Sequence, residues 1–184
     1  MRMVAAAFVA TLVLASAAEA KTWRIEPGDN AQAALQTAML DAEAGDTIQI
    51  ARGRYELTQG LSLDVDHVTV RGAGQDKTIL SFAHQARGAE GLLVTSDHVM
   101  LRDFAVENAR GDAIKARDCN DITFHGMRAE WTAGANTHNG AYGLYPVNCS
   151  NVLIENSIAR GASDAGIYVG QSRNIIVRNS TAEL

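Results

Sequence analysis

The triplet Val152-Leu153-Ile154 recurs 23 positions later as Ile175-Ile176-Val177, and this repetition decides the fold. Five such aliphatic cores occur along the chain, and their first residues lie 31, 23, 30 and 23 positions apart. The spacing indicates a coil of 23 residues with insertions of eight and seven residues in two of the turns. The five cores are Val68-Thr69-Val70, Val99-Met100-Leu101, Ile122-Thr123-Phe124, Val152-Leu153-Ile154 and Ile175-Ile176-Val177.

Two further sets of residues recur with the same period as the cores. We call such a set of equivalent residues in successive coils a column, and three columns predict three short strands in each coil. An aliphatic residue precedes each core by seven or eight positions, and a small or branched residue follows the last four cores by seven. The turns between them are rich in Asn, Asp, Gly and Ser. Stacked in parallel, such coils form an all-β, right-handed, single-stranded parallel β-helix, a solenoid whose inward side chains pile into ladders. The first column is Leu61, Leu92, Ile114, Leu144 and Ile167, and the second is Val106, Ala129, Ala159 and Ala182.

The two ends of the predicted solenoid differ. A helix over about 30–43, with Asp29 as its N-cap, is expected to cover the open end of the first coil, because its apolar residues fall on one face. The sequence stops within a coil at residues 181–184. We therefore expect either a chain truncated at this end or stacking and self-association through the C-terminal coil edge. The apolar helix face is Ala31, Leu35, Ala38, Met39 and Ala42.

The first 20 residues have the pattern of a cleavable export signal. Arg2 is followed by an apolar run over 4–15 and then by Ala18-Glu19-Ala20. This tripeptide has small residues at the two positions that a signal peptidase recognises. We predict cleavage after Ala20, a β-helix domain over 21–184 and a periplasmic or secreted protein. No later stretch is apolar for long enough to predict a membrane span.

Composition excludes several classes of function. The 184 residues are 47% hydrophobic and 20% charged, as in a single globular domain. A net charge of -5 argues against a nucleic-acid partner. Two cysteines cannot form a disulfide scaffold or a four-cysteine zinc site. His67 and His98 share a column without an evident third ligand, so no metal site is predicted.

Two pairs of residues one coil apart allow more than one interpretation. Cys119 and Cys149 share a column, and adjacent coils bring their Cα atoms near disulfide range. We prefer free inward thiols, because straight stacking rarely gives the Cβ directions that a disulfide needs. Glu107 and Glu130 also share a column, and like charges repel unless they are solvated or bridged by a cation. We expect a solvated surface there.

Several stretches carry a family resemblance: Gly45-Asp46-Thr47-Ile48, Gly53-Arg54-Tyr55, residues 68–74 with Thr78-Ile79-Leu80, residues 143–147 and residues 162–172. They resemble the pectate-lyase-like superfamily and a bacterial family of exported proteins with right-handed parallel β-helix repeats. Relatives with this architecture include pectate lyases, polygalacturonases and mannuronan C5-epimerases. The resemblance implies the fold over nearly all of the mature chain, but it does not specify the reaction.

The residues that directly follow the first column are expected to form a candidate ligand-binding face. If Ile114, Leu144 and Ile167 point inward, Lys115, Tyr145 and Tyr168 point outward and stack on one sheet face. The insertion over 131–143, which carries Asn136, His138, Asn139 and Tyr142, borders this face. Superfamily members that act on polysaccharides resemble this arrangement, and exposed tyrosines with flanking amides suit sugar rings. The alternative is that the tyrosines only stabilise the sheet by cross-strand packing.

Catalytic candidates are few. An eliminating lyase needs a base and a cation, often calcium, that neutralises the uronate carboxylate. Lys115 or Arg117 is a candidate base, and Asp112, Asp118 and Asp164 are candidates for holding calcium or sugar. Aspartates at coil corners more often satisfy turn amides. Neither a compact aspartate cluster nor an Asp-Pro-His motif occurs.

The sequence therefore predicts an exported protein that binds or acts on an acidic polysaccharide, with lyase-like or epimerase-like chemistry as the reaction considered. The predicted binding residues are Tyr145, Tyr168, His138, Asn139 and Asp112. The alternative is a non-catalytic β-helix module for structure or interaction.

Overall fold

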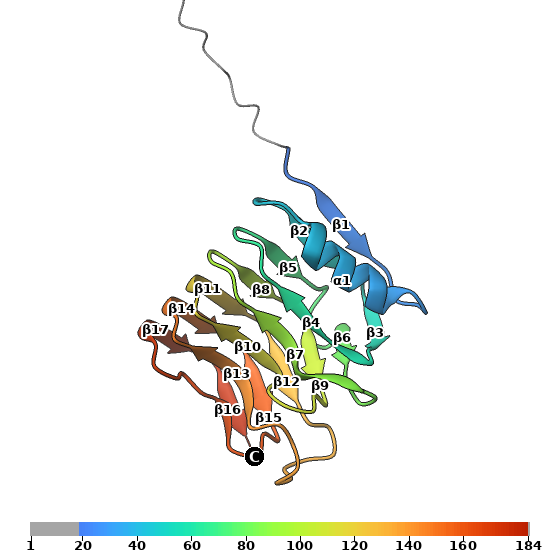
Figure 1. The fold of residues 1–184 in the computed structure, drawn as a ribbon. Helices are drawn as coiled ribbons and strands as arrows, with labels where there is room; N and C mark the ends of the chain where they lie inside the picture. Colours follow the sequence, from blue (N-terminus) through green and yellow to red (C-terminus); the bar gives the residue numbers. More distant parts are fainter. Residues whose placement is uncertain (1–18, 184) are drawn as a thin grey trace, which may run out of the picture.

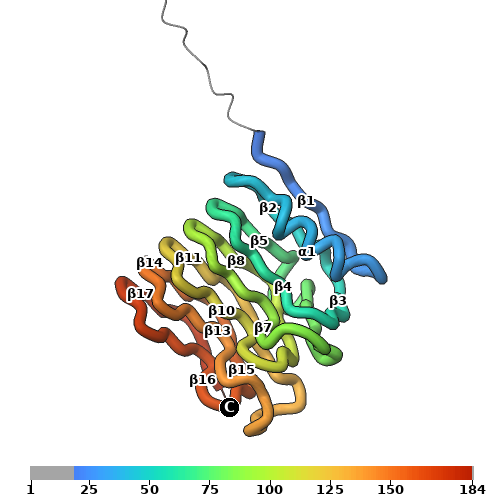
Figure 2. Tube along the Cα trace, viewed as in Figure 1, coloured from blue at the N-terminus to red at the C-terminus, as the bar shows by residue number. Residues whose placement is uncertain are grey.

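Every strand in the computed structural model, which describes residues 19–183, pairs in parallel with strands one coil away. The strands form three sheets, and each coil contributes one strand to each sheet in turn (Figures 1 and 2). This arrangement confirms the predicted parallel β-helix. Sheet A contains β1 (Thr22–Ile25), β2 (Thr47–Ile50), β5 (Thr69–Arg71), β8 (Met100–Arg102), β11 (Asn120–His125), β14 (Ser150–Glu155) and β17 (Arg173–Arg178). Sheet B contains β3 (Gly53–Glu56), β6 (Thr78–Ser81), β9 (Ala105–Glu107), β12 (Arg128–Glu130), β15 (Ile158–Arg160) and β18 (Thr181–Glu183). Sheet C contains β4 (Gln59–Leu63), β7 (Arg87–Val94), β10 (Ile114–Arg117), β13 (Tyr142–Val147) and β16 (Ala165–Ile167).

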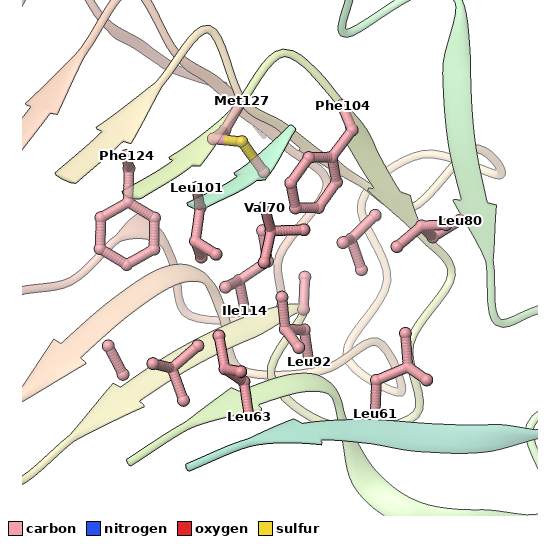
Figure 3. Close-up of a cluster of buried hydrophobic side chains, with 14 of the residues drawn as sticks. Leu61, Leu63, Val70, Leu80, Leu92, Leu101, Phe104, Ile114, Phe124 and Met127 are labelled. Atoms are coloured by element: carbon pink, nitrogen blue, oxygen red, sulfur yellow. The ribbon is translucent and has the colours of Figure 1, made fainter. Parts of the chain in front are cut away.

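The core consists of ladders of aliphatic side chains that run along the stack. In sheet A, Leu101 pairs with Val70 and Phe124, and all three are fully buried. In sheet C, Ile114 pairs with Leu92 on one side and with Leu144 on the other. Figure 3 shows residues from the three sheets pointing into this common interior. The predicted columns are confirmed, and burial of these side chains provides the main stabilising free energy of the fold.

Short corners join sheet A to sheet B. One corner residue in successive coils has a left-handed backbone, at Asp103 (φ 61°), Gly126 (φ 58°), Asn156 (φ 52°) and Asn179 (φ 50°). Asp, Asn and Gly tolerate this conformation best, so they turn the chain sharply at small cost. The repeat can be recognised in the sequence because the same type of turn occurs at the equivalent position of each coil.

The N-terminal helix α1 (Ala31–Asp41) covers the first coils, as predicted, but it is shorter than expected (Figure 1). Its buried residues belong to the predicted apolar face. The prediction that Asp29 caps the helix is wrong. Asn30 is the N-cap and makes no side-chain cap hydrogen bond, because its backbone (φ -91°, ψ 1°) is not extended as such a cap requires.

Side-chain amides of α1 bind the edge of sheet C at β4. The Gln36 amide donates to the carbonyl of Ser62 (3.1 Å) and accepts from its N–H (3.2 Å). The Gln32 amide oxygen accepts from the N–H groups of Thr58 (3.0 Å) and Gln59 (3.1 Å). The two glutamines satisfy groups that would otherwise be an open strand edge.

Cys119 and Cys149 form a disulfide between neighbouring coils, so the preferred interpretation of free thiols is wrong. Their Cα atoms are 4.6 Å apart, within the range that a disulfide spans. Both cysteines are buried just before strands β11 and β14. Their side chains point toward each other because of the local backbone where the two strands begin. The repeat spacing gives the distance between the two residues but not the direction of their side chains.

The expectation of a solvated surface at Glu107 and Glu130 is also wrong. Glu107 is buried, and its carboxylate pairs with Arg128 at 2.8 Å and with Arg54 at 2.7 Å. Arg128 also pairs with Glu130. The two carboxylates are therefore bridged by a guanidinium group on the outer face of sheet B.

The predicted export signal lies almost entirely outside the described residues, and export remains a prediction. No helix among residues 19–183 is long and apolar enough to span a membrane. In the last described coil, Ile176 and Val177 of β17 are 57% and 46% exposed.

Candidate functional site

The outer face of sheet C brings together the residues predicted from the inward column. Lys115 pairs in register with Leu93 and with Tyr145, so their side chains share one row. The N–H of Tyr168 donates to the carbonyl of Leu144 (3.1 Å), which aligns Tyr168 with the same row. These side chains are half-buried and accessible from the outside.

Three tyrosines form an aromatic cluster on this face. The ring centroids of Tyr142 lie 4.5 Å from those of both Tyr145 and Tyr168, and the latter two are 5.3 Å apart. The Lys115 Nζ lies 5.0 Å from the centroid of the Tyr145 ring. We call Tyr142, Tyr145 and Tyr168 the tyrosine cluster. The predicted stacking of Lys115, Tyr145 and Tyr168 is confirmed.

Tyr142 was expected only on the bordering insertion, and its place in the cluster has a local cause. Strict alternation from outward Tyr145 would turn Tyr142 inward. Instead Gly143 and Leu144 are both buried, which brings Tyr142 back to the outside. A Cβ at Gly143 would lie 2.9 Å from the Cβ of Ala159, so only glycine fits this inward position. Gly143 directly before the inward leucine is the sequence signal that could have placed Tyr142.

Carboxylates surround Lys115. Its Nζ is 3.3 Å from Asp112 and 3.5 Å from Glu90. Burial raises the pKa of Asp112, and the ion pair with Lys115 offsets part of that rise. An ammonium group has no lone pair, so a lysine held between two carboxylates suits binding an anion better than accepting a proton.

Asp164 joins the cluster through Tyr142. A hydrogen bond to Asp164 raises the pKa of the Tyr142 hydroxyl. The phenol is therefore held in its protonated form and donates a hydrogen bond. A raised pKa makes Tyr142 a poor general base.

The other predicted residues lie around this centre. Arg117 is two positions beyond Lys115 on β10 and is 3.2 Å from Asp118. The exposed His138 contacts Asn136 through its main-chain N–H (2.9 Å) and its Nδ1 (3.0 Å). Asn139 donates to the carbonyls of Gly134 (2.9 Å) and Gly161 (2.6 Å). The Asn139 amide thus anchors the insertion, and no hydrogen bond joins it or His138 to the tyrosine cluster within the described chain.

Asp112, one of the candidate calcium ligands, does not suit calcium in this arrangement. Calcium takes six to eight oxygen ligands. Lys115 Nζ already lies between the carboxylates of Asp112 and Glu90, where a cation would have to sit. Residues 19–183 contain no group of three or more His, Cys, Asp or Glu side chains arranged to hold a metal ion.

A concave surface lies at the corner between sheets C and A, apart from the tyrosine cluster. This groove of about 580 Å³ is lined by the disulfide and by polar turn residues, among them Asp97, Asp118 and Arg173. Of the residues considered for holding or acting on a ligand, Asp118 alone lines it. The tyrosine cluster, which combines aromatic surface with charge, therefore remains the candidate site.

Comparison with known proteins places the chain in a family. A family model described as "Right handed beta helix region" matches residues 68–183, and the protein belongs to this family. A comparison with curated protein sequences returns no match.

Solved structures share the fold at low identity. An alginate lyase from Paenibacillus sp. str. FPU-7 matches with a TM-score of 0.57 and 18% identity, over 87% of this chain and 65% of that chain. A pectin methylesterase in complex with a hexasaccharide matches with a TM-score of 0.50 and 10% identity, over 89% of this chain and 67% of that chain. The chain thus spans about two thirds of the length of these structures. They share the parallel β-helix fold with this chain.

Proposed function

We propose that this protein binds an acidic polysaccharide along the outer face of sheet C, at the tyrosine cluster and Lys115. The observation that carries the proposal is the contact of three tyrosine rings with one another beside a lysine ammonium on an exposed sheet face. Sugar rings present apolar C–H faces that pack on aromatic rings. Their hydroxyl edges accept hydrogen bonds from phenol groups and donate them to carboxylate groups.

The charged groups favour an acidic sugar. A uronate carboxylate bound over the tyrosines would lie near Lys115, and Arg117 adds a second cation on the same strand. The fold supports the proposal as well, because the two solved structures named above are an alginate lyase and a pectin methylesterase. The export pattern of residues 1–20 adds a periplasmic or secreted location to the proposal.

The geometry supports binding better than catalysis. An elimination or epimerisation needs a group that removes the proton from the sugar C5. Lys115 is engaged by two carboxylates, and the pKa of Tyr142 is raised. We therefore propose a binding protein, and lyase-like or epimerase-like activity is the alternative that the same experiment tests.

Replacing Tyr145 and Tyr168 with alanine is expected to weaken polymer binding by about tenfold for each residue, because each removes aromatic contact area. Affinity electrophoresis and calorimetry with pectate, alginate and a neutral polysaccharide measure the effect, with and without calcium. Ultraviolet absorbance of unsaturated products reports elimination. Circular dichroism checks that the variants fold.

Met100→Ala is the matched control, because Met100 is an exposed apolar residue on the outer face of sheet A. It should leave binding unchanged. The proposal fails if the unmodified protein binds none of the polymers, or if Met100→Ala weakens binding as much as Tyr145→Ala does.

Asp112→Asn is expected to raise the affinity for an anionic polymer by about two- to fivefold at neutral pH, because it frees the Lys115 charge. The raised pKa of Asp112 sets the sign of the pH dependence: affinity should rise as the pH falls through that pKa, while the polymer remains charged. In Asp112→Asn, most of this increase in affinity at low pH should be absent. Calorimetry at several pH values measures the affinity of the unmodified protein and of Asp112→Asn, and the exposed Asp41→Asn variant is the control. If the affinities of the unmodified protein and of Asp112→Asn changed equally with pH, the proposed effect of Asp112 on Lys115 would be contradicted.

A further inference from the structure

Asp46 is a buried carboxylate at the N-terminal end of the solenoid. It directly precedes β2 and is only 4% exposed. It accepts hydrogen bonds from the main-chain nitrogen of Lys21 (2.7 Å), the indole Nε1 of Trp23 (2.9 Å) and the main-chain nitrogen of Glu43 (3.1 Å). Burial raises the pKa of Asp46, but these hydrogen bonds, together with the charge of Lys21, outweigh burial and lower it. Asp46 is therefore charged at neutral pH.

This charge has no side-chain cation as a direct partner. Among residues 19–183, no ion pair within 4 Å includes Asp46. The side chain of Lys21 turns instead to Trp23, with its Nζ 3.2 Å from the ring centroid. A buried carboxylate whose hydrogen-bond donors are all neutral is costly, and a cation in direct contact with it would offset more of that cost than the Lys21 side chain does from a distance.

The donor closest to Asp46 is the nitrogen that the predicted cleavage would free. Hydrolysis of the Ala20–Lys21 peptide bond consumes one water, leaves a carboxylate on Ala20 and converts the Lys21 amide into a primary amine. An α-amine has a pKa of about 7.7–8.0 and is mostly protonated at neutral pH. The new ammonium group would lie against the Asp46 carboxylate at the position of the present 2.7 Å hydrogen bond.

We propose that cleavage after Ala20 creates an ion pair between the α-ammonium group of Lys21 and the carboxylate of Asp46, and that this pair fixes β1 onto the first coil. β1 is the edge strand of sheet A and pairs with β2 from Thr22 to Ile25. Before cleavage the same nitrogen is a neutral amide, so the uncleaved chain keeps the costly buried charge. Full stability of the fold thus depends on processing.

The pH dependence of the pair follows from its groups. Besides the Lys21 side chain, the ionisable residues adjoining Asp46 are Glu43, which donates its main-chain N–H, and His67, whose carbonyl accepts from Gly45 (2.9 Å). The carboxylate raises the pKa of the α-amine in the folded state. While Asp46 is charged, the stabilisation is therefore complete below about pH 7.7, and it is lost as the pH rises through the raised pKa of the α-amine in the folded state.

The test compares two chains, one that begins at Lys21 and one that begins at Glu19. The chain beginning at Lys21 is expected to melt about 5–10 °C higher near pH 7. Asp46→Asn should abolish this difference, whereas exposed Asp41→Asn should preserve it. The difference should shrink at alkaline pH. Mass spectrometry of the exported protein should give Lys21 as the first residue.

A different first residue in the exported protein would overturn the proposal, as would equal melting temperatures of the two chains. It would also fall if the difference survived in Asp46→Asn. Should Asp46→Asn not fold, the α-amine is titrated directly by nitrogen-15 NMR in the chain beginning at Lys21. A value raised above that of a free α-amine supports the ion pair, and an unchanged value contradicts it.

Discussion

Replacing Arg128 with alanine is expected to lower the free energy of unfolding by about 3–5 kcal/mol. The Arg128 and Glu107 side chains are only 8% and 5% exposed and are 2.8 Å apart. Removing the guanidinium leaves Glu107 buried with the half-exposed Arg54 as its remaining cation, and it leaves Glu130 beside it. Urea unfolding followed by circular dichroism measures the loss.

Arg160→Ala is the matched control, because Arg160 lies on the same outer face of sheet B. It pairs with Glu183 at 2.7 Å, but the two side chains are 41% and 51% exposed. Its loss should cost no more than about 1 kcal/mol. Equal losses for the two variants would show that burial does not distinguish the two ion pairs, contrary to the structure.

Removing the disulfide by replacing both Cys119 and Cys149 with serine is expected to cost about 3–4 kcal/mol. The bond closes a loop with a sequence separation of 30 residues, and its loss frees the unfolded chain. Chemical unfolding of the oxidised protein, the reduced protein and the double variant measures the effect, and thiol titration of the denatured oxidised protein should find no free thiol.

Reduction itself provides the control for the disulfide. A reducing agent should destabilise the unmodified protein and leave the double serine variant unchanged. If complete reduction, verified by thiol titration, left the stability of the unmodified protein unaltered, the predicted contribution of the crosslink would be refuted.

The fold could be predicted from sequence because parallel stacking places equivalent residues in register at a fixed period. The buried pairs Leu101 with Phe124 and Ile114 with Leu144 follow from the repeat spacing of the sequence alone. The outward direction of Lys115, Tyr145 and Tyr168 then followed from alternation. Both inferences use only the period of the chain.

The features that the sequence did not predict depend on side-chain direction and on contacts across several coils. Arg54 and Arg128 are far apart in sequence, yet both reach Glu107 from a neighbouring row of sheet B. The orientation of Cys119 toward Cys149 depends on the backbone at the strand start. Tyr142 joins its cluster only because Gly143 breaks the alternation.

The glutamines of α1 have a consequence for aggregation. Exposed strand edges recruit extended segments of other chains, and this is how many β-rich proteins begin to form fibrils. Gln36 and Gln32 already use the N–H groups of Ser62, Thr58 and Gln59 and the carbonyl of Ser62. A strand from another chain could pair with sheet C at β4 only by displacing the helix. The helix α1 therefore prevents intermolecular β-sheet formation at this edge.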